Sequence, residues 1–559
     1  MRSLSKLTAN KRTMFAVLLV VVLLLQACGG GATSTPTEFV PSGAQATATQ
    51  PEQAPAPTNT QAMQATEPAT QAEASPTPEQ AAAATGGVLK VAMQPIVQTD
   101  PAFISSDPEV LVANTVYDYL VDVTVDNTIA PRLARDWQIS DDGLTYVFTL
   151  ADGVTFHDGT PMTAEDVVWT FNRLRDPDLG LPTADLYSNI ADIQASGDLE
   201  VTFTLKETNP FFLFDLSDNH ALVMKADTQD PNDLNGTGPF VVSEYIPEDR
   251  LVVKANPNYF INGQPKLAEI DFIFFNDQTA QVEALRGGQV DLVMVISTDS
   301  FISLQDTPGL QMLQVATNGF DLVRLRADQE PGNDPRVIQA LKLATDRQAI
   351  FDLVLQGFGE IGRDSPIGPM YKQYYTEDTP LPERNVDQAK QLLSDAGYGD
   401  GLDLTMHVPD TGNRPNLATV LKQQWAEAGV NVELAIEPES VYYGDNGWLE
   451  VNLGITGWGS RPYPQFYLDV MLKCDAKWNE AHYCNPDLDQ LITEAGTTLD
   501  EQTRVQDYHE IQRILIEEGP IIIPYFFAQL GAINDQFQGF EMKPFPGRSD
   551  FRPVTYTGS

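Results

Sequence analysis

Basic side chains are scarce in this chain of 559 residues: 34 lysines and arginines stand against 77 aspartates and glutamates. The formal net charge at pH 7 is therefore −43. A surface this acidic repels the phosphates of nucleic acids and anionic lipids, which argues against both as partners. The charge mildly favours a cationic or neutral ligand, although solubility or a salty habitat explains it more readily.

The sequence also lacks the common catalytic and nucleotide-binding motifs. We find no G-x-S-x-G, H-E-x-x-H or Walker A motif, and no G-x-G-x-x-G after a predicted strand. The five histidines are scattered, at positions 157, 220, 407, 482 and 509. These absences predict a protein that is not an enzyme and that needs neither a cofactor nor a metal ion.

Apolar runs long enough to cross a membrane are absent as well. Residues 14–25 form an apolar run that is too short for a membrane span and that follows a basic segment, as in a secretion signal. Leu25-Gln26-Ala27-Cys28 resembles a lipobox, which predicts that residues 1–27 are removed and that Cys28 is lipidated. A plain cleaved signal and an uncleaved anchor are the alternatives.

Residues 28–86 contain no lysine or arginine and hardly any large apolar side chain. Their Ala, Thr, Pro, Gln and Glu composition cannot bury enough surface to offset the entropy of ordering, so we expect a disordered tether. Such a tether would reach about 45 Å or more. The folded body would then begin at residue 87, exported and held at the outer face of the cell membrane by its lipid.

Cysteine is scarce too: besides Cys28, the chain contains Cys474 and Cys484. Two cysteines this close together in an exported protein favour a disulfide. Two free thiols, or a metal site that includes His482, are the alternatives.

The most informative stretch, residues 131–171, predicts a β-hairpin followed by a helix. Apolar and polar residues alternate on both sides of the Asp-Gly turn at Gly143, as in paired strands. Thr163 and Asp166 have the spacing of a capping box ahead of a helical apolar stripe. Nothing in this stretch points to catalysis.

The same stretch closely resembles a signature of the bacterial extracellular solute-binding proteins, family 5, the dipeptide-, oligopeptide- and nickel-binding class of ABC transporters. The matching pattern is P-x-L-A-x-x-W-x-x-S-x-D-G-x-T-Y-x-F-x-L, continued by G-V-x-F-H-D-G-x-P-x-T-A-x-D-V. Segments at residues 236–240, 287–292 and 333–347 fit the same family.

The resemblance implies an α/β fold, the two-lobed type II periplasmic-binding-protein fold (cluster C) with an extra inserted domain. Lobe I would comprise residues 87–120, 236–325 and 520–559, the inserted small domain residues 121–235, and lobe II residues 326–519. Predicted helices at 389–396 and 417–428 each precede a predicted strand, at 402–408 and 430–436, which also favours an α/β lobe.

Two loops of the second lobe have the composition of a ligand site. Trp458, Arg461 and Tyr463 lie in a loop that offers a stacking surface and a fixed cation. A core tryptophan with an arginine salt bridge is the alternative. In dipeptide-binding relatives an Asp-Pro at this place pairs with the amino terminus of the ligand, whereas this sequence has Tyr463-Pro464 there.

The second loop contains Arg414, in an Arg-Pro pair that resembles the one gripping the ligand carboxylate in the dipeptide branch. A solvated arginine at the start of a helix is the alternative. Ser105 and Ser106, after the first strand, lie where the first lobe of the family meets its ligand.

The implied function is that of the lipid-anchored solute-binding component of an ABC importer. The protein would act as a monomer, capture a small solute such as an oligopeptide in the cleft between its lobes, and pass it to a permease with ATPase subunits. It would touch the membrane through the lipid on Cys28 and bind no nucleic acid. The alternative is a lipoprotein that binds an oligosaccharide or another solute as a sensor or receptor.

Overall fold

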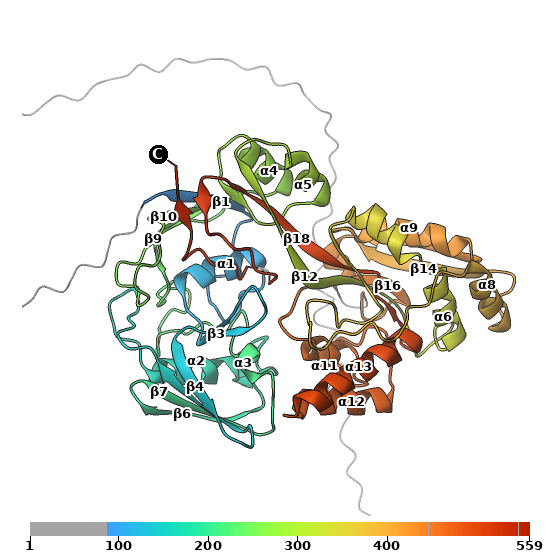
Figure 1. The fold of residues 1–559 in the computed structure, drawn as a ribbon, viewed down its shortest axis with the longest axis horizontal. Coiled ribbons are helices and arrows are strands. Elements are labelled where there is room, and N and C mark those ends of the chain that lie inside the picture. Colours follow the sequence, from blue (N-terminus) through green and yellow to red (C-terminus); the bar gives the residue numbers. More distant parts are fainter. Residues whose placement is uncertain (1–85, 445–446, 546, 559) are drawn as a thin grey trace, which may run out of the picture. The chain divides into compact units, whose positions relative to one another are not determined.

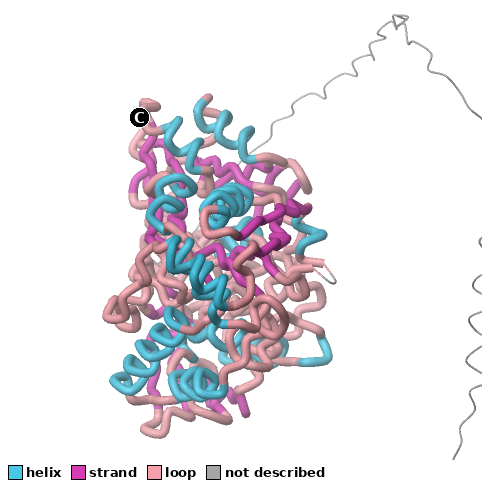
Figure 2. Tube along the Cα trace, turned by 90° about the vertical axis from the view of Figure 1, so that its right-hand side faces the viewer, coloured by secondary structure: helices cyan, strands magenta, loops and turns pink. Residues whose placement is uncertain are grey.

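The computed structural model describes residues 86–444, 447–545 and 547–558 (Figure 1). The predicted signal, the lipidation site at Cys28 and the tether up to residue 85 lie outside the described residues. In the described part, no helix is both long and apolar enough to cross a membrane. Helices and strands both run through the folded part, so the fold is α/β (Figure 2).

The main sheet of this fold has 12 strands. Its central strands, β12 (Leu310–Leu325) and β18 (Tyr525–Asn534), pair antiparallel (Figure 1). The order continues from β18 through β11 (Leu292–Val293), β1 (Val88–Met93), β10 (Glu269–Phe274), β9 (Arg250–Ala255) and β8 (Phe240–Ile246). From β12 it continues through β16 (Leu453–Trp458), β14 (Leu402–Pro409) and β15 (Val430–Glu437), while β13 (Gly359–Ile361) pairs with β18 and β17 (Ile521–Ile522) with β12.

A second sheet contains the predicted hairpin. Its four antiparallel strands run in the order β4 (Ala134–Ile139), β5 (Thr145–Leu150), β7 (Glu200–Leu205) and β6 (Ile190–Gly197). Gly143 in the hairpin turn has a φ of 67°, which glycine adopts without strain. Helix α2 (Ala164–Leu174) packs on β6 and β7, and its capping box is present, with the Thr163 N–H donating to Asp166 Oδ2 at 2.7 Å. The structure confirms the predicted hairpin and capped helix.

The helices predicted between residues 389 and 428 are α8 (Val386–Asp395) and α9 (Arg414–Ala426). Each begins three residues earlier than its apolar pattern indicates, because the first turns, Val386-Asp387-Gln388 and Arg414-Pro415-Asn416, contain too few apolar residues to extend the pattern. The strands expected after them are β14 and β15, which pair in parallel. The remaining helices are α1 (Asp107–Val116), α3 (Phe212–Asp215), α4 (Gln278–Arg286), α5 (Thr298–Leu304), α6 (Pro335–Ala344), α7 (Arg347–Ile350), α10 (Glu439–Tyr442), α11 (Gln465–Met471), α12 (Pro486–Thr497) and α13 (Glu501–Glu517).

Shorter elements complete the described chain. They are strands β2 (Val121–Val123), β3 (Ile129–Pro131), β19 (Phe537–Gln538) and β20 (Thr555–Tyr556), a 3-10 turn at Pro177–Leu179 and a π-helical turn at Phe351–Leu355.

The apolar cores divide the described residues into two halves. One continuous core extends from Leu89 on β1 to Phe203 on the four-stranded sheet, and residues 87–309 and 535–558 around it are called the first half below. Separate cores surround Trp425 and Tyr508, and residues 326–519 are called the second half. Strands β12 and β18 pass between the halves and join them.

Candidate functional site

Trp458 is the last residue of β16, directly before the loop, and its side chain is packed in the core. Trp458 is 8% exposed, its indole stacks on Phe320 with ring centroids 6.4 Å apart, and its other faces meet Tyr467 and Trp478. The indole Nε1 donates a hydrogen bond to Glu480 Oε1 at 3.1 Å. The side chain therefore supports the loop as part of the core of the second half.

Glu480 is a buried carboxylate at the centre of a polar network, and sequence patterns did not single it out. Its Oε2 accepts a hydrogen bond from Thr456 Oγ1 at 2.6 Å and lies 3.2 Å from Arg324 Nε. Burial raises the pKa of Glu480, and the Arg324 guanidinium opposes that shift. Trp458 is therefore held by a hydrogen bond to a carboxylate as well as by the packing of its ring.

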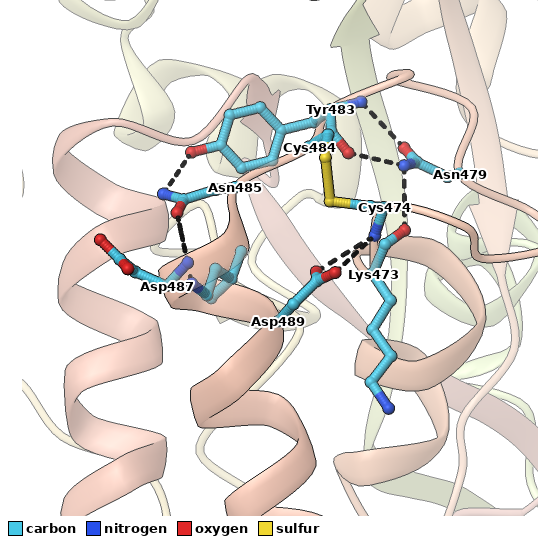
Figure 3. The surroundings of a disulfide bond; sticks show 9 residues. Lys473, Cys474, Asn479, Tyr483, Cys484, Asn485, Asp487 and Asp489 are labelled. Carbon is cyan, nitrogen blue, oxygen red and sulfur yellow. Dashed lines mark hydrogen bonds between the residues drawn. A yellow bond between two sulfur atoms is a disulfide. The ribbon is translucent and has the colours of Figure 1, made fainter.

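The disulfide between Cys474 and Cys484 closes the segment that carries Glu480 (Figure 3). The Cys474 N–H donates to both carboxylate oxygens of Asp489, at 3.1 and 3.3 Å. Inside the loop, the Asn479 side-chain amide donates to the carbonyls of Lys473 and Tyr483, at 3.1 and 2.7 Å. The cross-link and these bonds hold Glu480 beneath Trp458.

Arg461 and Tyr463 lie at the edge of this core, where the loop meets the first half. The Tyr463 hydroxyl donates a hydrogen bond to Asp215 Oδ1, and its ring stacks on Phe211 with centroids 4.9 Å apart. The carbonyl of Pro462 accepts from Asn127 Nδ2 at 2.7 Å. The loop is thus the place where the two halves meet.

A small cavity of about 40 Å³ lies between the halves at this meeting point. Arg461 and Tyr463 form one wall, and Asp215, Asp218 and Arg548 form the other. The Arg461 guanidinium lies 4.7 Å from the centroid of the Phe466 ring. We call this space the central cavity.

The carboxylates of the opposite wall have unlike environments. Burial raises the pKa of Asp215 to about 7, against hydrogen bonds from Tyr463 and Asn209 that lower it. Burial also acts to raise the pKa of Asp218, but the neighbouring His220 outweighs it and holds that pKa below its usual range. The negative charge of Asp218 is therefore balanced by its neighbour His220, whereas the carboxylate of Asp215 has no such partner.

Arg414 lies at the start of α9 and beneath the loop, outside the lining of the central cavity. Its Nη1 donates to Asp321 Oδ1 at 3.4 Å and its Nη2 donates to Thr411 Oγ1. A Cβ at Gly457 would overlap Arg414 Nη1, so a side chain at this position of β16 would displace the guanidinium. Asp321 also accepts from Tyr525 Oη at 2.6 Å, which ties Arg414 to β18.

Ser105 and Ser106 cap α1 and do not line the central cavity. Their backbone N–H groups donate to Glu109 Oε2 at 2.9 and 3.1 Å. Burial raises the pKa of the next residue, Asp107, to about 6, and Arg461 partly offsets this. The start of α1 therefore lies within electrostatic range of the loop.

The sequence profile of the bacterial extracellular solute-binding proteins, family 5 Middle, matches residues 128–479. The chain belongs to this family. The probable di/tripeptide-binding protein 5 of Pseudomonas aeruginosa (strain UCBPP-PA14) is 30% identical over 470 residues, which cover 76% of this chain and 87% of that protein. Heme-binding protein A of Haemophilus influenzae is 27% identical over 486 residues, covering 79% and 87%.

Solved structures share the fold. The crystal structure of the ABC transporter substrate binding protein CtaP from Listeria monocytogenes superposes with a TM-score of 0.75 at 23% identity, over 85% of this chain and 100% of that chain. Members of family 5 are extracytoplasmic solute-binding proteins and not enzymes. In the part of the chain that the structure describes, no three His, Cys, Asp or Glu side chains are grouped as metal ligands would be.

For this family 5 chain, the structure brings together some of the predicted site residues. Arg461 and Tyr463 share the central cavity, while Trp458 and Arg414 support their loop from within the second half. Asp215 is a wall residue that the sequence patterns missed. The sequence around Asp215 gave little indication of this role. Asp215 follows the apolar run Phe211–Phe214, and no motif links it to the loop that it faces.

Proposed function

We propose that this chain is the lipid-anchored solute-binding component of an ABC importer. It captures a small solute, an oligopeptide or a similar compound, between its halves and delivers it to a membrane permease and its ATPases. Similarity to the probable di/tripeptide-binding protein, at 30% identity, supports a peptide as the solute. Similarity to the heme-binding protein shows that relatives of this chain bind solutes of other classes as well. The lipid on Cys28 would provide the membrane contact of a monomer.

The observation that carries this proposal is the set of bonds between the halves around the central cavity. Among the described residues, four hydrogen bonds cross from one half to the other: Asn127 to Pro462, Tyr463 to Asp215, Thr208 Oγ1 to the Thr497 carbonyl at 2.6 Å, and Gln356 Nε2 to Asp299 Oδ1 at 2.7 Å. Few bonds of this kind suit halves that separate and close again, as binding proteins do around a ligand.

The size of the central cavity requires such a movement. A space of about 40 Å³ holds one or two water molecules, whereas sites for small solutes measure about 300–1,000 Å³. The moving bodies would be lobe I (87–120, 236–325 and 520–559) with its inserted domain (121–235), and lobe II (326–519). Strands β12 and β18 would contain the hinge.

Within this proposal the predicted residues have distinct roles. Arg461 and Tyr463 face the solute because they line the central cavity, and Trp458 holds their loop in place. Arg414, Ser105 and Ser106 lie outside the lining of the central cavity, and within this proposal they contact a solute that extends beyond it. Cys474 and Cys484 stabilise the segment beneath the loop.

The test begins with mass spectrometry of whatever co-purifies with the full chain. Calorimetry with di- to pentapeptides and with oligosaccharides then identifies the class that binds, and peptide binding is expected. Deletion of the gene should abolish uptake of the bound solute. Uptake that persists, together with loss of a transcriptional response to the solute, would replace the importer by a sensor.

A further inference from the structure

Asp215 is a buried carboxylate without a cation. The residue is 3% exposed at the end of α3, its Oδ1 accepts from the Tyr463 hydroxyl and its Oδ2 accepts from Asn209 Nδ2 at 2.7 Å. Within the described residues it forms no salt bridge, and the charges of Asp218 and Asp469 both raise its pKa. Two neutral donors leave most of its negative charge uncompensated.

The arginines of the central cavity are engaged elsewhere. Arg548 Nη2 lies 2.7 Å from Asp122 Oδ1, and its guanidinium lies 3.8 Å from the centroid of the Tyr119 ring. The Arg461 guanidinium rests on Phe466 and lowers the pKa of Asp218. Neither arginine pairs with Asp215.

Asp215 also lines a second and larger cavity of about 520 Å³, which we call the side cavity. Its walls come from the loops at residues 182–189 and 207–211 and from α3 on one side, and from α11, α12 and the segment at Lys477 and Trp478 on the other. Leu186, Tyr463 and Phe466 line both cavities, so the two spaces adjoin at Asp215. The volume falls within the range of small-molecule sites.

The lining of the side cavity combines aromatic rings with acidic groups. Phe211, Tyr463, Phe466 and Trp478 supply the rings, and Asp185, Glu207, Asp215 and Asp469 supply the acids. The basic residue of the lining, Lys477, lies 5.8 Å from the centroid of the Trp478 ring. Aromatic faces and carboxylates both attract organic cations.

We propose that the side cavity binds a cationic group of the solute, an ammonium or guanidinium that pairs with Asp215 while its apolar body packs on Phe211, Phe466 and Trp478. The inference rests on the proposed capture of a solute between the halves and narrows it to cationic solutes. A cation here would neutralise a charge that the protein itself leaves unpaired, and it would do so where solvent screens little.

The test compares matched probes on the full chain at pH 8, where Asp215 is ionised. Calorimetry is run with phenethylamine and its uncharged analogue 2-phenylethanol, and with the blocked tripeptides N-acetyl-Ala-Lys-Ala-amide and N-acetyl-Ala-norleucine-Ala-amide, whose termini carry no charge. Each charged probe should bind at least tenfold more tightly than its uncharged partner. Asp215→Asn should remove this preference, while Asp192→Asn, an equal charge change on the exposed side of β6, should keep it.

The outcomes separate the inference from the proposed function. Peptides that bind without a preference for lysine overturn the cation site and leave peptide capture standing. If phenethylamine binds through Asp215 while no peptide binds, the cation site is supported and peptides are excluded as the solute. Failure of both charged probes to outbind their partners on the unsubstituted chain overturns the inference, whatever the stability of Asp215→Asn.

Discussion

Glu480 is the residue on which the support of Trp458 depends, and its removal should be costly. Glu480→Gln keeps a hydrogen-bond acceptor for the indole but leaves the Arg324 guanidinium buried without its counter-ion. We expect the free energy of unfolding to fall by about 3–5 kcal/mol, the usual cost of breaking a buried ion pair. Urea denaturation followed by circular dichroism measures it.

Two controls accompany this substitution. Glu283→Gln breaks the exposed pair with Arg286 and should cost less than about 1 kcal/mol. Replacing both Arg324 and Glu480 by methionine should cost less than Glu480→Gln alone, because no buried charge is left unpaired. Equal losses of unfolding free energy in Glu480→Gln and Glu283→Gln would show that the buried network stabilises the fold no more than an exposed ion pair does.

Asp215 should make the stability of the protein depend on pH. Its pKa is about 7 in the folded chain and about 3.9 in an unfolded one, so between these values the folded state holds a proton that the unfolded state has lost. Stability from this group is therefore present below about pH 4 and is lost as the pH rises through about 7. The loss amounts to about 4 kcal/mol, at 1.36 kcal/mol per pKa unit.

Asp215→Asn isolates this contribution. Thermal melts from pH 4 to 8 should show a melting temperature that falls less steeply with pH in Asp215→Asn than in the unsubstituted chain. His220 and Asp218 titrate in both proteins, so the difference between the two curves reports Asp215 together with its coupling to Asp218. Parallel curves would mean that Asp215 is ionised throughout this range in the folded state.

For single residues, the sequence indicated which side chains could take part in a site but not which side chains they contact. The aromatic and cationic character of the loop was readable, and Arg461 and Tyr463 do line a cavity. Their partners could not be read, because Tyr463 and Asp215 are 248 residues apart and only the fold brings them together. The burial of Trp458 was undecided for a similar reason, since Glu480 has no pattern that marks it as a partner.

At the scale of elements, local signals were sufficient where an element is half exposed. The hairpin β4–β5 and the helix α2 followed from alternation, an Asp-Gly turn and a capping box. The long strand β12 had no such signal, because residues from Thr317 onwards are buried on both faces and do not alternate. The strand that joins the two halves was therefore invisible to periodicity.

The disulfide is the element-scale feature with the clearest expected effect. Cys474 and Cys484 are separated by 10 positions, and a loop of that length stabilises a fold by about 2–3 kcal/mol through the unfolded chain. Reduction with dithiothreitol should lower the melting temperature, since only hydrogen bonds and packing, among them the bonds of Asn479 and of the Cys474 N–H, then hold the loop. The variant with both cysteines changed to serine should melt at the reduced value and respond to no reductant.

At the scale of the whole molecule, two bodies are joined by β12 and β18. They touch through a few hydrogen bonds and through Phe211 of the first half, whose ring packs into the core around Tyr508. The two-lobed α/β fold was predictable because a family signature carries it. The balance between separated and closed halves was not, because it depends on contacts such as Tyr463 to Asp215 that no local pattern encodes. That balance should be adjustable by removing those contacts.

Tyr463→Phe combined with Thr208→Ala deletes two of the hydrogen bonds between the halves. At about 0.5–1.5 kcal/mol for each bond, the equilibrium should shift towards separated halves by about 5- to 150-fold. Small-angle X-ray scattering without ligand should then give a larger radius of gyration at unchanged helical content. Tyr375→Phe with Thr419→Ala removes a tyrosine–carboxylate bond and a threonine–carbonyl bond that each lie within one half, so it should leave the radius unchanged. An equal change in both double variants would mean that general destabilisation, and not release of the halves, expands the molecule.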